Sequence, residues 1–96
     1  MKPHHYSNPG PELRFIRLKL GLSLRDVHAM SLEVAKKHSS RFFVIPPTCL
    51  HAIEAKHVAP SIHRLYTLAV VYGCTVSDLL CLYGIQIQPV VSDLVN

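Results

Sequence analysis

The fold predicted for this chain depends most on one short segment, Pro46-Pro47-Thr48-Cys49-Leu50-His51-Ala52-Ile53-Glu54-Ala55-Lys56. Proline does not fit a helix interior, but it suits the first turn of a helix, where its missing N–H is not needed. A short helix is therefore predicted from about Thr48. Leu50 and Ile53 are three residues apart, so they would face inward together. This leaves an exposed face that consists of Thr48, His51, Ala52, Ala55 and Lys56.

A longer helix is predicted before this segment. Ser23-Leu24-Arg25-Asp26 has the pattern of a capping box, in which the serine hydroxyl accepts from an amide three residues on and the aspartate reaches back. Val27, Met30 and Val34 continue one face, which extends the helix to about His38. The apolar stretch that follows, Arg41-Phe42-Phe43-Val44-Ile45, is predicted to be an extended connector that its phenylalanines hold in the core.

The first helix is predicted from Pro11 and Glu12, after a flexible N-terminal arm at residues 1–10 that prolines and a glycine interrupt. Its buried stripe is predicted to contain Leu13, Ile16 and Leu20, with Arg14, Arg17 and Lys19 outside it. Gly21 ends this helix.

Two further helices are predicted after residue 60. Ser61 is the expected N-cap of the first, whose stripe of Ile62, Leu65, Leu68, Ala69 and Tyr72 ends at Gly73. Thr75-Val76-Ser77-Asp78 is a second capping box and starts the other. Residues 85–88 alternate apolar and polar side chains, which predicts a strand or an extended segment there, and residues 85–96 are predicted to form the C-terminal tail. The fold class is therefore all-α, with five helices in one domain at residues 11–84.

The composition favours a folded, basic domain. Hydrophobic residues make up 49% and charged residues 17% of the 96 residues, which argues against disorder, and the formal net charge is +4. Residues 1–48 contain eight Lys and Arg against three Asp and Glu, whereas residues 49–96 contain two against three. A concentration of positive charge in one half of the chain is expected if one side of the fold faces a polyanion. A basic surface that is simply solvated would have the same charges.

Several other classes of protein are disfavoured. Cys49, Cys74 and Cys81 are odd in number and lack the C-x-x-C spacing, which indicates reduced, mostly buried thiols in a cytoplasmic protein and no metal site. The chain has no apolar signal core and no run of membrane-spanning length. Cys49 and His51 would point apart on a helix, so neither an enzyme nor a cofactor is expected, and no small-molecule ligand is indicated. Tyr66, Tyr72 and Tyr83 have the spacing of core residues.

The order of several motifs resembles a known family. These motifs are Leu18-Lys19-Leu20-Gly21-Leu22-Ser23, then Leu50-His51-Ala52-Ile53-Glu54, then Pro60-Ser61 with Leu65, Leu68 and Ala69, and finally Gly73-Cys74-Thr75-Val76-Ser77-Asp78-Leu79-Leu80. From Leu13 to Tyr83 the chain resembles the Cro/phage-repressor-type (XRE) helix-turn-helix family. The resemblance implies a lambda-repressor-like fold and a transcriptional regulator that binds double-stranded DNA. Two features depart from the family: an insertion of about a dozen residues between Val27 and Leu50, and Leu24 where many members have glutamine.

The resemblance also implies which residues contact DNA. The third helix would read bases in the major groove through Thr48, His51, Ala52 and Lys56. The phosphates would be bound by Ser23, Arg25, Lys36, Lys37 and Arg41. Because the reading face lacks arginine, asparagine and glutamine, specificity is expected to be modest unless a homodimer reads two half-sites. The dimer contact would come from residues 85–91 or from the Leu79-Leu80-Leu82-Tyr83 face, both of which are equally suited to packing on the chain's own core.

A binding module for another protein is the alternative function. In that hypothesis the third helix has lost its base contacts, and the apolar insert Phe42-Phe43-Val44-Ile45 binds the partner. The weak reading face and Leu24 favour this alternative, whereas the basic N-terminal half and Lys56 favour DNA.

Overall fold

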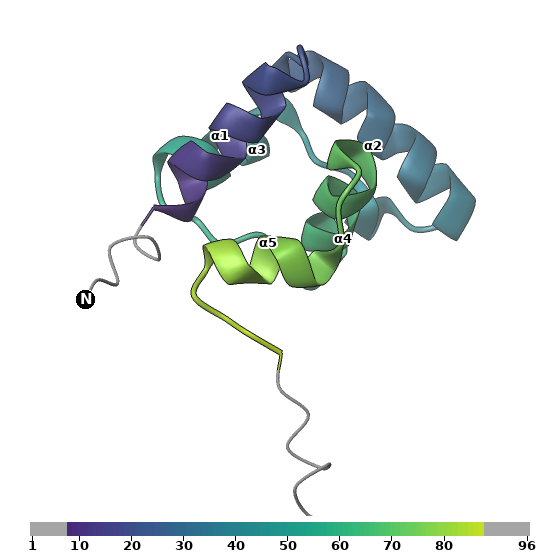
Figure 1. Cartoon of the computed structure of the whole chain (residues 1–96). Coiled ribbons are helices and arrows are strands. Elements are labelled where there is room, and N and C mark those ends of the chain that lie inside the picture. Colours follow the sequence, from purple (N-terminus) through teal and green to yellow (C-terminus); the bar gives the residue numbers. More distant parts are fainter. Residues whose placement is uncertain (1–7, 88–96) are drawn as a thin grey trace, which may run out of the picture.

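Five α-helices make up the fold in the computed structural model, which describes residues 8–87 (Figure 1). They are α1 (Pro9–Lys19), α2 (Leu24–His38), α3 (Pro47–Ala55), α4 (Ile62–Tyr72) and α5 (Val76–Leu82), with one 3-10 turn, η2 (Arg41–Phe43), between α2 and α3. The described residues contain no strand, so the predicted all-α class and its five helices are confirmed. Residues 85–87 lead away from α5 without regular structure. The other residues of the predicted tail, 88–96, and residues 1–7 of the predicted arm lie outside the described residues.

The helices begin and end where local chemistry favours a boundary. The Ser23 hydroxyl accepts from the Asp26 amide at 3.0 Å, and the Asp26 carboxylate accepts from the Ser23 amide at 2.8 Å, as in the predicted capping box. Thr75 and Asp78 form the second predicted box, with both distances at 3.0 Å. Gly73 ends α4 in the left-handed conformation, at φ 72°, which glycine adopts without steric cost.

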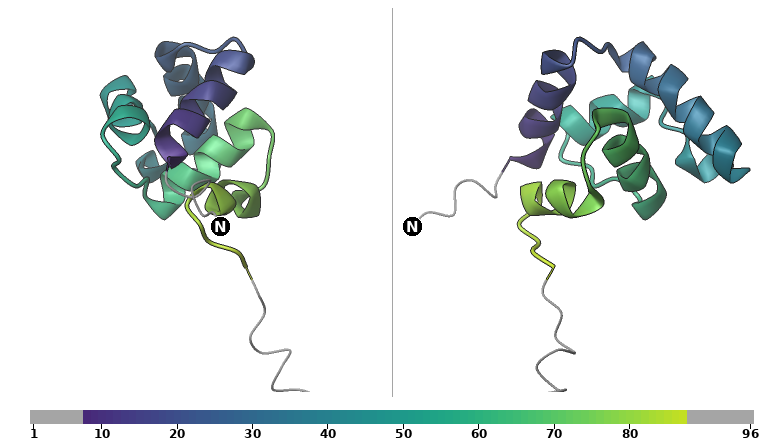
Figure 2. Two further views of the ribbon diagram at one scale, coloured as in Figure 1. Left: turned by 60° about the vertical axis from the view of Figure 1, so that its left-hand side comes forward. Right: turned by 45° about the vertical axis from the view of Figure 1, so that its right-hand side comes forward.

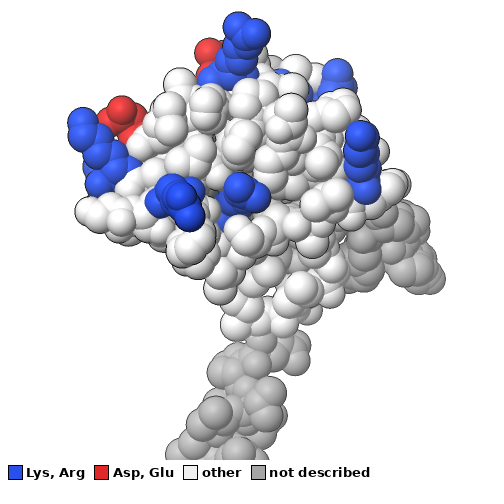
Figure 3. All heavy atoms as spheres, turned by 180° about the vertical axis from the view of Figure 1, so that it is seen from behind, with Lys and Arg blue, Asp and Glu red and all other residues white. Residues whose placement is uncertain are grey.

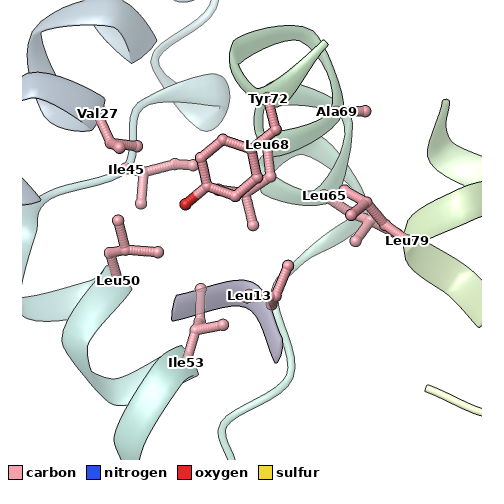
Figure 4. Packing of buried hydrophobic residues seen from close by; sticks show 10 residues of the cluster. All are labelled: Leu13, Val27, Ile45, Leu50, Ile53, Leu65, Leu68, Ala69, Tyr72 and Leu79. Atoms are coloured by element: carbon pink, nitrogen blue, oxygen red, sulfur yellow. The ribbon is translucent and has the colours of Figure 1, made fainter. Parts of the chain in front are cut away.

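All five helices and the connector before α3 contribute to one apolar core (Figure 4). The Tyr72 ring of α4 lies in the middle of it, close to Ile45 of the connector, while Leu65 and Leu79 meet between α4 and α5. The core residues are Leu13, Val27, Ile45, Leu50, Ile53, Leu65, Leu68, Ala69, Tyr72 and Leu79. Leu50 and Ile53 of α3 are buried, as predicted.

The pattern of apolar residues was misleading at several surface positions. Leu20 and Met30, predicted to be buried, are 49% and 40% exposed, and Ile62 is 76% exposed. On α2 the inward position belongs to Ser31, which is fully buried. Phe42 is 61% exposed, so the connector is held in the core by Ile45 and not by both phenylalanines as predicted. Cys81 is exposed, which also differs from the prediction of mostly buried thiols.

The first helix begins two residues earlier than predicted, at Pro9. Pro9 and Pro11 both lie in its first turn, where the amide that proline lacks has no helical partner. Gly10 is buried against the end of α3, where a Cβ atom would overlap the Glu54 carbonyl oxygen. Residues 9 and 10 therefore belong to the helical domain, and α1 and α3 lie side by side (Figures 1 and 2).

Candidate nucleic-acid interface

A buried ion pair joins α3 to α1. Arg17 Nε donates to Glu54 Oε2 at 2.8 Å, and Arg17 Nη2 donates to Glu54 Oε1 at 2.9 Å. The third contact of this guanidinium runs from Nη1 to the Leu22 carbonyl oxygen, at 2.9 Å. The hydrogen bond to Glu54 favours the charged guanidinium and raises the pKa of Arg17. One side chain thus fixes the end of α3 and the residue before the Ser23 cap of α2.

Neither partner of this ion pair was predicted. Arg17 was expected outside the buried stripe of the first helix, but its side chain is only 7% exposed, and that of Glu54 is 3% exposed. The spacing along each helix could have indicated their burial. Arg17 is four residues after Leu13, and Glu54 is four residues after Leu50, so each lies on the same face as a core leucine. Both charged residues therefore lie on inward faces, where two opposite charges from different helices can pair.

The connector before α3 is held on both sides by side-chain hydrogen bonds. From α2, the Ser31 hydroxyl accepts from the Ile45 amide at 2.9 Å. From α4, Thr67 Oγ1 donates to the Phe43 carbonyl at 2.7 Å and Arg64 Nε donates to the Val44 carbonyl at 2.9 Å. These bonds satisfy backbone groups that neither a helix nor a strand would satisfy. Side-chain hydrogen bonds therefore hold the segment before α3, just as the Arg17–Glu54 pair holds its end.

The outward face of α3 is open. Thr48, His51 and Lys56, three of the four predicted base-reading residues, are exposed, while Ala52 is half-buried. The insert does not cover these three side chains, so this helix presents a hydroxyl, an imidazole and an ammonium group to solvent. Hydrogen-bond donors and acceptors of this kind are the groups with which proteins read base edges.

The predicted phosphate-binding residues are all exposed, but they form two separate sets. Ser23 and Arg25 lie at the start of α2, whereas Lys36 and Lys37 lie in its last turn. A helix of 15 residues separates its two ends by about 21 Å. The start of α2 is tied to the end of α3 through Arg17, which contacts both Leu22 and Glu54. One set therefore lies near the end of α3.

The Ser23 cap is the weaker phosphate candidate within that set. Its hydroxyl already accepts from the Asp26 amide, and the Asp26 carboxylate occupies the same helix start. Hydrogen bonds from the backbone and side chain of Ser23 lower the pKa of Asp26, which is therefore negatively charged at neutral pH. An anion bound there would be repelled by this carboxylate, so Arg25 is the better candidate.

The second set continues into a groove beside the start of α3. Arg41, the first residue of η2, lines this groove of about 640 Å³ together with Pro46, the N-cap of α3. Arg64 and His63 of α4 line it from the other side. The sequence places His63 near the DNA backbone, but it gives no such indication for Arg64; both residues lie in the first turn of α4, directly after the Ser61 cap. Cationic side chains thus lie near both ends of α3.

The charges on the face opposite to that of Figure 1 stand apart from one another (Figure 3). Lys and Arg side chains are distributed around and across this face, separated by uncharged surface, and the acidic side chains visible there lie beside basic ones. Exposed basic residues of the whole described chain are Arg14, Lys19, Arg25, Lys36, Lys37, Arg41 and Lys56. Lys and Arg therefore form no continuous basic patch on the face that Figure 3 shows.

Three further features of residues 8–87 concern metal ions, membranes and thiol chemistry. In residues 8–87 no three His, Cys, Asp or Glu side chains are grouped so that they could hold a metal ion. In the same range no single helix is long and apolar enough to cross a membrane, and α4 and α5 reach that length and composition only as a pair bent by 109°. Burial raises the pKa of the Cys74 thiol, which makes this cysteine less reactive.

No protein-family model matches this chain, and neither a curated protein nor a solved structure is similar enough to match it. The candidate interface is therefore inferred from the residues of this chain alone.

Proposed function

We propose that the chain is a lambda-repressor-like helix-turn-helix protein of the XRE type, and that it binds double-stranded DNA through α3 as a transcriptional regulator. One observation best supports this proposal: hydrogen bonds hold α3 at both ends, through Glu54 and through the connector before Pro47. Thr48, His51 and Lys56 nevertheless stay exposed. A rigid helix with an open polar face, near cations at both ends, suits a major groove between two phosphate walls. A cytoplasmic location fits such a role.

Affinity and specificity would come from different residues. Arg25 near one end of α3, and Arg41 near the other, would release counterions from the phosphates. Thr48 and His51 would contact base edges, and the Ala52 and Thr48 methyl groups suit the methyl group of thymine. Because no arginine, asparagine or glutamine stands on this face, each base contact discriminates weakly, and two half-sites would be needed for a unique target.

The alternative function, a binding module for another protein, relies on the insert at residues 42–45. Of its four apolar residues only Phe42 is exposed, because Ile45 is buried and Phe43 and Val44 are half-buried. Phe42 packs beside the His63 ring, with 5.4 Å between the ring centres. One exposed aromatic side chain is a small contact for a stable protein partner, so the observations favour DNA.

The first experiment measures binding to a random-sequence duplex by fluorescence anisotropy over a range of salt concentrations. We expect affinity to fall steeply with salt, and Arg41→Gln to weaken binding and reduce the slope of log K against log salt by about one. Arg14→Gln is the matched control, because Arg14 is an exposed arginine of α1 that the proposal does not use. Affinity that is absent, or independent of salt, would reject the proposal in favour of the protein-binding module.

The second experiment selects bound duplexes from a random pool with the parent chain and with His51→Ala. Enrichment of one sequence, and a change in that sequence for the variant with an unchanged salt slope, would assign His51 to base reading. Enrichment of the same sequence by both proteins would remove His51 from the base-reading set.

A further inference from the structure

The groove beside the start of α3 is larger than the proposed phosphate contact of Arg41 requires. Its volume of about 640 Å³ lies within the range of small-molecule sites in proteins, which is about 300–1,000 Å³. Arg41 stands on one side of it, and His63 and Arg64 of α4 stand on the other. None of its lining residues is Asp or Glu, so no carboxylate neutralises these basic side chains within the groove. The lining is therefore suited to an anion.

Arg64 is already oriented for such an anion. Its Nε atom donates to the Val44 carbonyl oxygen at 2.9 Å, which fixes the plane of the guanidinium group. Among the residues that the structure describes, its two Nη atoms have no hydrogen-bond or ion-pair partner, and the residue is half-buried. A guanidinium group held in this way can donate to the oxygens of a phosphate or carboxylate group with little further loss of conformational freedom.

An aromatic ring lies beside these basic side chains. Phe42 is 61% exposed, and the centre of its ring is 5.4 Å from that of His63, at an interplanar angle of 41°. Val44 and Pro46, both half-buried, add apolar surface to the same groove. A planar ring can stack on Phe42, whereas an inorganic anion would leave this apolar surface uncovered. The lining as a whole fits a ligand that joins an anionic group to a planar ring.

We propose that this groove binds a free nucleoside monophosphate, whose phosphate group contacts Arg64 and Arg41 and whose base packs against Phe42. A nucleotide has both required parts, and the several oxygens of its phosphate group can accept from two guanidinium groups at once. Because Arg41 cannot contact the nucleotide and a DNA phosphate at the same time, the nucleotide competes with DNA. This competition rests on the proposed DNA-binding function, whereas nucleotide binding itself does not.

The first test titrates the chain with adenosine monophosphate in a calorimeter, without DNA. We expect one nucleotide per chain, and weaker binding of inorganic phosphate and of adenosine, because each offers only one of the two contacts. Phe42→Leu should weaken nucleotide binding about tenfold and leave phosphate binding unchanged. Phe15→Leu is the matched control, because Phe15 is 60% exposed but belongs to α1. Nucleotide binding that is absent or no tighter than phosphate binding overturns the proposal, as does an equal effect of the two variants.

The same titration tests the phosphate contact through Arg64→Lys, which keeps the positive charge but removes the planar fork of donors. This variant should bind adenosine monophosphate and inorganic phosphate more weakly, and by similar factors, because both lose the same contact. Thermal melting checks that the variant is folded. An unchanged nucleotide affinity in the folded variant would reject the phosphate contact of Arg64.

The second test adds adenosine monophosphate to the random-sequence duplex at constant ionic strength and follows the anisotropy. We expect the apparent DNA affinity to fall as the nucleotide saturates the groove, and Phe42→Leu to need about tenfold more nucleotide for the same effect. If the nucleotide binds but DNA affinity does not change, the two ligands do not share Arg41 and the competition is rejected. If the chain binds no DNA, the proposed function fails and the competition with it, while calorimetry decides nucleotide binding by itself.

The last nucleotide of a DNA strand has the same chemistry as a free nucleotide, so a third test separates the two sources. It compares a duplex that carries 5′ phosphates with the same duplex that ends in 5′ hydroxyl groups. Equal affinities are expected if the ligand is a free nucleotide. A preference for the phosphorylated duplex that Phe42→Leu abolishes would assign the groove to a DNA end and overturn the proposal.

Discussion

Arg17 contacts both carboxylate oxygens of Glu54 at 2.8 and 2.9 Å, although 37 residues separate the two along the chain. The pair lies across the contact between α1 and α3, the helix that carries the proposed reading face. Breaking a buried ion pair leaves one charge without a partner in a medium that solvates it poorly. The orientation of α3 and the stability of the fold therefore depend on the same two side chains.

Arg17→Met should lower the free energy of unfolding by about 3–5 kcal/mol, because it leaves the Glu54 carboxylate buried and unpaired. The measurement is urea denaturation followed by circular dichroism. The double variant Arg17→Met with Glu54→Leu should recover most of this loss, since two apolar side chains of similar volume then replace the pair. A single variant that loses under about 1 kcal/mol, within the range of exposed ion pairs, would contradict this account.

Gly10→Ala should destabilise the protein, although alanine is normally favoured over glycine within a helix by about 1 kcal/mol. The reason is the close approach of α1 to α3, which leaves no room for a Cβ atom beside the backbone of Glu54. Gly21→Ala serves as a comparison, because its Cβ would meet nothing within 4 Å and only its φ of +75° opposes the change. Thermal melting of the two variants should place Gly10→Ala lower, and a melting temperature above that of the parent chain would refute the close contact.

Local signals in the sequence were sufficient to predict most helix boundaries. Ser23 and Thr75 begin their helices with the predicted capping boxes, and Gly73 ends α4, because each of these signals is satisfied within a few residues. α2 ends at His38, as its apolar period predicted.

The partners of buried polar groups could not be predicted in this way. Ser31 is buried because it binds the Ile45 amide, 14 residues away, and Arg17 is buried because of Glu54. Apolar periodicity favoured Met30 over Ser31, since it cannot register a hydrogen bond to a distant segment. The position of the connector, and with it the two separate cationic sets around α3, depends on such long-range contacts.

Ser39→Gly should raise the free energy of unfolding by about 0.5–1 kcal/mol. Ser39 ends α2 with φ 51° and ψ 42°, a left-handed conformation that glycine adopts without the steric cost of a side chain. The control is Ser40→Gly, because Ser40 has φ −150° and its hydroxyl accepts from the Phe42 amide at 3.3 Å, so this variant should lose stability. Urea denaturation of both variants checks the prediction, and equal effects would show that the strain at Ser39 is negligible.

Acid should destabilise the fold partly through the two capping boxes. Hydrogen bonds from Ser23 and Thr75 lower the pKa values of Asp26 and Asp78 below the ordinary 3.8. A carboxyl group whose pKa is lower in the folded chain stabilises the fold at pH values above its unfolded pKa, and this contribution disappears as the pH falls through the folded pKa. Asp26→Asn combined with Asp78→Asn should therefore flatten the decline in stability below about pH 4, measured as urea midpoints at a series of pH values. Glu12→Gln, which removes an exposed carboxylate of α1 outside both boxes, should leave that decline nearly unchanged, and an equal flattening in both proteins would show that the capping boxes are not its source.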